Sequence, residues 1–84
     1  MNYKDDIIKI IQEATNLTIP IENVDLDTDL QSVGMDSISF IKIIVGIENL
    51  FEIEFPDEKL LITEAGTLKN LFSIANEEIN KKEK

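Results

Sequence analysis

At residues 30–51 the chain reads LQSVGMDSISFIKIIVGIENLF, in which a short mixed segment leads into a long apolar run. Gly34 permits a positive φ or the close approach of a second backbone or a ligand. Asp36 can cap the amide groups that follow it. These signals predict a helix over residues 37–51. Apolar side chains cover most of its circumference, so it either lies at the centre of the core or presents apolar surface to a partner.

Two amphipathic patterns flank this central helix. In residues 3–15 the apolar side chains recur at helical spacing, namely Tyr3, Ile7, Ile10, Ile11 and Ala14. After Gly66, Thr67 is a good N-cap for a last helix. The apolar face of that helix comprises Leu68, Leu71, Phe72, Ala75 and Ile79. Because each pattern has one apolar face, we expect both helices to pack against the central one.

Two connecting segments complete the chain. Residues 17–35 form a long loop interrupted by Pro20, and we expect its apolar residues to attach it to the helices: Leu17, Ile19, Ile21, Val24, Leu26 and Leu30. In residues 52–66, Pro56 begins a short helical turn that ends at Leu60 or Leu61. The expected fold is all-α. It is a small four-helix bundle in one domain, residues 1–84, with three main helices, a short third helix and a long loop between the first two.

The composition excludes several classes of protein. The 84 residues include 8 Lys+Arg, all of them lysine, against 17 Asp+Glu, for a net charge of −9 at pH 7. This balance argues against nucleic acid and anionic membranes as partners. The chain has no cysteine and no histidine, which excludes a thiolate nucleophile, a Ser-His-Asp triad and a Cys/His metal site. The apolar run Ile43–Ile47 is far shorter than the ~18 residues that a membrane span needs. We therefore expect a non-catalytic cytoplasmic monomer.

Ser37 is the candidate functional residue. It falls in the first turn of the 37–51 helix, where the positive end of the helix dipole favours a phosphate esterified to its hydroxyl. The run Gly34-Met35-Asp36-Ser37-Ile38 resembles the signature of the acyl and peptidyl carrier proteins, with isoleucine where leucine is usual. The resemblance continues through Glu48, Phe51, Ile53, Phe55, Pro56 and Asp57 to Thr67-Leu68, and so spans nearly the whole chain.

This resemblance implies a specific chemistry. Ser37 would receive 4′-phosphopantetheine from coenzyme A through a separate Mg²⁺-dependent transferase. The thiol of the arm would carry an acyl, aminoacyl or peptidyl group as a thioester. The partners would be the transferase, a loading enzyme and downstream synthase or condensation enzymes. Their footprint would lie beside the attachment site, at Met35, Asp36, Ile38, Phe40, Ile41 and Lys42.

The polar or small stripe of the 37–51 helix bears on the pathway. It consists of Ser39, Lys42, Gly46 and Asn49 and contains no acid. The carriers of fatty acid synthesis present an acidic helix at this place to basic enzyme patches. The stripe therefore favours a freestanding carrier in polyketide or nonribosomal peptide assembly, and fatty acid synthesis stays open as the alternative.

Three readings outside the carrier family also stay open. In the first, Ser37 is only a helix-capping residue, which is a common role for a serine at a helix start. Asp25, Asp27, Asp29 and Asp36 stand at positions 1, 3, 5 and 12 of an EF-hand-like calcium loop, although Leu30 occupies the position that requires glycine and position 12 prefers glutamate. A helical adaptor without a cofactor is the third reading.

Overall fold

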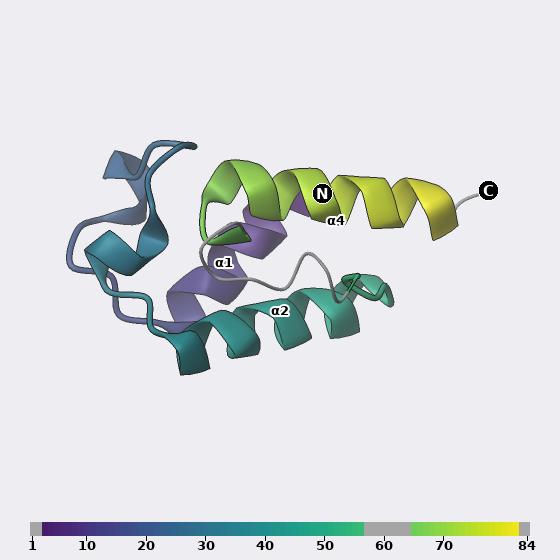
Figure 1. Cartoon of the computed structure of the whole chain (residues 1–84), viewed down its shortest axis with the longest axis horizontal. Coiled ribbons are helices and arrows are strands. Elements are labelled where there is room, and N and C mark those ends of the chain that lie inside the picture. The colour runs from purple at the N-terminus through teal and green to yellow at the C-terminus, as the bar shows by residue number, and fades with distance from the viewer. Residues whose placement is uncertain (1–2, 57–64, 83–84) are drawn as a thin grey trace.

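The computed structural model of the chain describes residues 3–56 and 65–82, and all the regular structure in these ranges is helical. It comprises α1 (Tyr3–Ala14), α2 (Ser37–Phe51), α4 (Leu68–Lys82) and two short 3₁₀ helices, η1 (Ile21–Asn23) and η2 (Leu30–Val33). Figure 1 shows α2 and α4 extended along the long axis of the molecule with α1 behind them. The all-α helical bundle is confirmed. The predicted helical turn after Pro56 falls on residues 57–64, outside the described residues.

The core is built by all three long helices and by the loop between α1 and α2. Its largest fully buried side chains are Ile7, Ile11, Leu30, Ile43, Ile47 and Leu71. Each such burial contributes about 1.5–3 kcal/mol to the stability of the fold. The predicted attachment of the loop is confirmed for Val24 and Leu30, which are buried. The prediction is wrong for Leu26, because its side chain is exposed.

The segment that leaves α1 is bonded to the turn that precedes α2. The Thr18 amide donates to the Val33 carbonyl at 2.8 Å, and the Thr15 hydroxyl donates to the Gly34 carbonyl at 3.4 Å. Gly34 ends η2 with φ 118° and ψ −6°, and a Cβ at this position would stand 2.8 Å from the Asn16 carbonyl oxygen. Both roles predicted for this glycine, a positive φ and the close approach of a second backbone, are therefore present.

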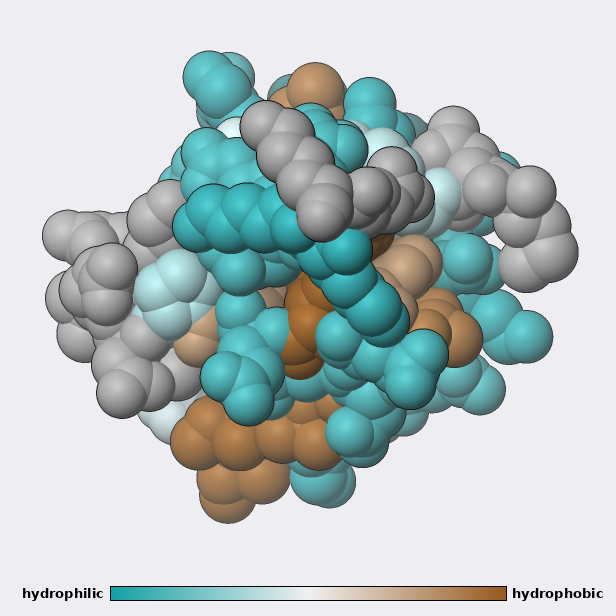
Figure 2. Space-filling model, turned by 90° about the vertical axis from the view of Figure 1, so that its right-hand side faces the viewer, coloured by the Kyte–Doolittle hydropathy of each residue, from teal (hydrophilic) through white to brown (hydrophobic). Residues whose placement is uncertain are grey.

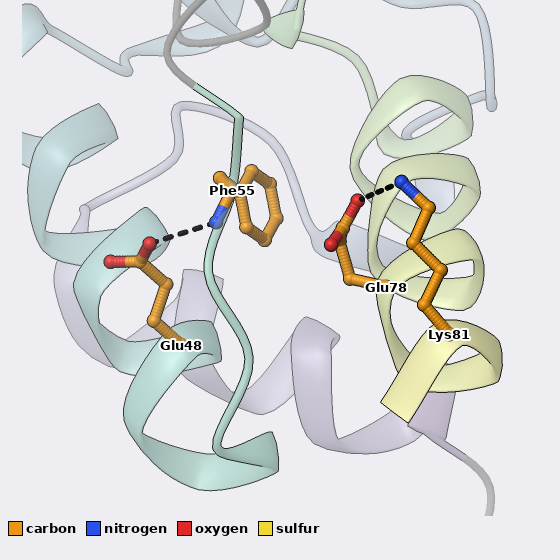
Figure 3. A network of polar contacts seen from close by, with 4 residues as sticks. All are labelled: Glu48, Phe55, Glu78 and Lys81. Carbon is orange, nitrogen blue, oxygen red and sulfur yellow. Dashed lines mark hydrogen bonds and ion pairs between the residues drawn. The ribbon is translucent and has the colours of Figure 1, made fainter. Parts of the chain in front are cut away.

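The opposite end of α2 is tied to the connection that follows it. The Glu48 carboxylate accepts a hydrogen bond from the Phe55 amide at 2.9 Å, and the ring of Phe55 lies between α2 and α4 (Figure 3). The Lys82 ammonium at the end of α4 donates to the Phe51 carbonyl at 3.3 Å. Within α4, Lys81 contacts Glu78 at 3.2 Å (Figure 3). Glu48 thus serves an internal contact, and both ends of α2 are held by other segments.

Alanine at Gly34 tests the crossing of the two segments. Gly34→Ala should lower the free energy of unfolding by about 1–3 kcal/mol, because the new Cβ meets a backbone oxygen and alanine disfavours a positive φ. Gly46→Ala is the control. Its Cβ would stand 2.9 Å from the Ile10 Cγ2, so Ile10 has to move, but no backbone atom is met. The gain in helix stability of about 0.5–1 kcal/mol offsets part of that cost, so the loss should be smaller than for Gly34→Ala. Urea denaturation measures both, and equal losses would contradict the argument.

Candidate functional site

Ser37 is the first residue of α2, and its side chain is exposed. Asp36 caps the helix, as the sequence predicts: its carboxylate accepts a hydrogen bond from the Ser39 amide at 2.7 Å. Its carbonyl accepts from the Phe40 amide at 2.9 Å. The first bond satisfies an amide donor that a helix start leaves without an intrahelical partner, and the second is the first i→i−4 bond of α2. The Ser37 hydroxyl therefore stands at a well-ordered helix N-terminus, on the solvent side.

The charge at this helix start is set by Asp36. The hydrogen bond from the Ser39 backbone amide is the main cause that holds the pKa of the Asp36 carboxyl below its ordinary value, and the Ser39 side chain and the Lys42 ammonium act in the same direction. Asp36 is thus ionised at neutral pH. Its charge is already engaged with the helix amides, and the positive end of the α2 dipole still favours an anion at the neighbouring serine.

The residues predicted to flank the attachment site divide into two groups. Ile38 is 68% and Ile41 60% exposed, and Asp36 and Lys42 are exposed as well. Met35 and Phe40, at 3% and 4%, are buried in the core. Their side chains are therefore not part of the exposed surface beside Ser37, and their place in a partner footprint stays a prediction. Phe40 lies on the same helix face as the core residues Ile43 and Ile47, at helical spacing.

The predicted polar stripe of α2 lies on one side of the helix, but only part of it is exposed. Gly46 packs against Ile10 of α1, and Ser39 is half-buried. Lys42 and Asn49 are exposed instead on the same side of the helix as Ile38, Ile41 and Val45. Sequence reasoning missed Val45 as a surface residue, since an isoleucine-rich helix gives no signal for which apolar side faces water.

The outward face of α2, formed by Ile38, Ile41, Lys42, Val45 and Asn49, is thus largely apolar. In Figure 2 brown side chains gather at the lower edge of the molecule, where α2 runs in Figure 1. The face carries one positive charge, that of Lys42, and no carboxylate. Exposed apolar surface of this kind is typical of an interaction site. It begins at Ser37, so a protein that reaches this serine also meets the apolar face.

A polar hollow of about 280 Å³ lies between the end of α1 and the start of α2. Its lining includes Thr15, Asn16, Gly34, Asp36 and Ser39. Hydroxyl, amide and backbone groups line it beside the exposed serine. The carboxylates of Glu13 and Asp36 also line the hollow, and none of the described residues that line it is a cation. The hollow therefore fits the amide-bearing part of a phosphopantetheine arm on Ser37 by hydrogen bonding, and the N-terminus of α2 is the group that suits the phosphate.

Three of the four acids of the calcium-loop alternative make separate contacts. Asp29 caps η2 by accepting from the Gln31 amide at 3.0 Å, Asp36 caps α2, and Asp27 lies 3.9 Å from Lys69. Within residues 3–56 and 65–82, no group of three or more His, Cys, Asp or Glu residues is placed to hold a metal ion. In the same ranges no helix is long and apolar enough to cross a membrane.

Comparison with known proteins agrees with this geometry. The family described as the phosphopantetheine attachment site matches residues 5–73. An acyl carrier protein homolog of Ureaplasma parvum serovar 3 is 37% identical over 76 residues, which are 90% of this chain and 88% of that protein. An acyl carrier protein homolog of Mycoplasma genitalium is 33% identical over 70 residues, 83% of this chain and 77% of that protein. An aminoacyl carrier protein of Agrobacterium fabrum is 33% identical over 54 residues, 64% of this chain and 65% of that protein.

The Asp36 cap predicts a dependence of stability on pH. Because the folded-state pKa is lowered below 3.8, the ionised cap stabilises the fold above the unfolded-state pKa and loses its effect as the pH falls through the folded-state value. Asp36→Asn retains a capping oxygen without the charge. The melting temperature of the wild type should exceed that of Asp36→Asn at about pH 7, and the difference should shrink towards about pH 3. A difference that stays constant over this range would show that the charge has no part in the cap.

Proposed function

This chain belongs to the acyl carrier protein family, whose cofactor is 4′-phosphopantetheine, and we propose that the arm is attached to Ser37. The observation that carries the proposal is the exposed hydroxyl at the N-terminus of α2, inside the matched range 5–73. Attached there, the arm supplies the thiol that this cysteine-free chain lacks and holds its cargo as a thioester.

The residues around Ser37 would position the serine and contact the partner enzymes. Gly34 and the segment of residues 15–18 fix the turn that aims the serine outward. Asp36 holds the first turn of α2 while its carboxylate faces solvent. Ile38, Ile41 and Lys42 are exposed and would form the part of the surface that a transferase, a loading enzyme or a synthase meets next to the serine. The protein itself would catalyse no step and would work as a cytoplasmic single-domain monomer.

The chemistry of the outward face of α2 supports a proposal about the pathway. The proposal is a freestanding carrier of acyl, aminoacyl or peptidyl groups in polyketide or nonribosomal peptide assembly, because Lys42 is the one charge on that face. A basic enzyme patch shaped for an acidic helix would place like charges opposite each other, which is a standard means of rejecting a wrong partner. Fatty acid synthesis is the alternative, and the selectivity experiment below separates the two.

Attachment at Ser37 is tested by co-expression with a promiscuous phosphopantetheinyl transferase. Intact mass should show one phosphopantetheine on the wild type and none on Ser37→Ala, with helical circular dichroism unchanged. Ser32→Ala is the matched control, since Ser32 is an exposed serine five residues earlier whose hydroxyl donates to the Asp29 carbonyl; it should be modified fully. A modified Ser37→Ala, or an unmodified wild type, would rule out the proposed site.

Partner selectivity is tested on variants already loaded with the arm. Lys42→Glu should raise kcat/KM with a fatty-acid-type acyltransferase by about twofold to fivefold, the range of one exposed charge contact, and lower it with the cognate partner. Ile41→Ala should weaken the cognate reaction and leave transfer of the arm to Ser37 intact. Measurements at two salt concentrations separate charge from apolar contact. Equal use of the wild type by both enzymes would contradict the selectivity and leave the arm assignment standing.

A further inference from the structure

Leu26 is exposed although its backbone is firmly held. It sits in a turn in which the Thr28 amide donates to the Asp25 carbonyl at 3.1 Å, and the Asp25 amide donates to the Thr28 hydroxyl at 3.2 Å. The Leu26 carbonyl accepts from the Lys69 amide at 3.0 Å, in the first turn of α4. The Leu26 carbonyl therefore caps the start of α4, and the leucine side chain lies exposed at that end of the helix. A turn with this role needs no apolar side chain, and polar residues are usual there.

The Leu26 side chain forms one wall of a groove of about 280 Å³. Tyr3 of α1 and Phe72 of α4 also line the groove, and their rings meet edge to face with centroids 6.4 Å apart. The groove is built by α1, the Asp25–Thr28 turn and α4, and so by elements other than the one that carries Ser37. We refer to it as the Leu26 groove.

Two lysines line the Leu26 groove in a protein that is strongly acidic overall. The Lys4 ammonium lies 5.8 Å from the centroid of the Phe72 ring. The Lys69 side chain is largely exposed, and its ammonium lies 3.9 Å from the Asp27 carboxylate, which is also exposed. An ion pair between two exposed groups contributes little binding free energy, so the Lys69 ammonium can also contact a second partner. An apolar floor with cations at its edge is complementary to an apolar side chain flanked by carboxylates.

We propose that the Leu26 groove docks an acidic segment of a partner protein that inserts one apolar side chain between Leu26 and Phe72. The proposed partner segment is acidic, whereas the net charge of −9 on the chain favours basic partners. The Leu26 groove shares no lining residue with the hollow beside Ser37, so such a partner would hold the protein and leave the serine open. The proposal does not depend on what Ser37 carries.

The probe is a short acetylated peptide, Glu-Glu-Leu-Phe-Glu, added to the ¹⁵N-labelled full chain. Amide shifts should concentrate at Leu26, Lys69 and Phe72, and fluorescence should follow them, because Tyr3 is the only tyrosine and there is no tryptophan. Leu26→Asn should weaken binding about fivefold, as expected from losing roughly 1 kcal/mol of apolar contact. Lys69→Glu should weaken it too, and the peptide Lys-Lys-Leu-Phe-Lys should not bind.

Leu50→Asn is the matched control, because Leu26 and Leu50 are both 54% exposed and Leu50 lies on α2. It should leave peptide binding unchanged. Leu26→Asn should be modified at Ser37 at the wild-type rate, which separates this proposal from the carrier assignment. The proposal is overturned if the peptide causes no shifts or shifts on α2, or if Leu26→Asn and Lys69→Glu both bind like the wild type. It is also overturned if sedimentation shows a dimer that Leu26→Asn abolishes, because a second copy then occupies the groove.

Discussion

The crossing of two backbone segments at Gly34 is the constraint on which the rest of the structure depends. The chain leaving α1 passes so close to this residue that a single added carbon would collide with the Asn16 carbonyl. Two segments can approach in this way only where one has no side chain and can adopt a positive φ. Because residues 15–18 and 33–34 are bonded there, the direction in which α2 starts, and with it the position of Ser37, is set by α1.

The two sides of α2 lie in different environments. Its inner side supplies Phe40, Ile43, Ile44 and Ile47 to the core, and its outer side leaves Ile38, Ile41 and Val45 in water. Isoleucine is only a fair helix former, so the inner contacts and the ties at both ends hold the helix in shape. Exposed apolar groups beside an exposed serine have no stabilising role in the isolated protein, and apolar surface of this kind is typical of an interaction site.

Much of the fold could be predicted from local patterns. The helices over residues 3–15 and 37–51 appear in the structure with near-identical bounds, because apolar periodicity and the cap at Asp36 are properties of neighbouring residues. The role of Gly34 followed from the few conformations that need glycine. The surface of α2 could not be predicted in the same way. Nine of its residues are large and apolar, and periodicity cannot rank one apolar side over another when nearly all sides are apolar.

The sequence by itself determined the helical class, the absence of cysteine and histidine chemistry, and the serine at the start of α2, since each rests on residue identity and short-range spacing. Only the tertiary structure decided that Met35 and Phe40 are buried while Ile38 and Ile41 are exposed, that Gly46 meets Ile10, and that Leu26 stands at the edge of a groove with Phe72. These are contacts between residues far apart in the chain. They depend on how whole helices are oriented, and the orientation is set by the sum of many packing contacts that no local pattern contains.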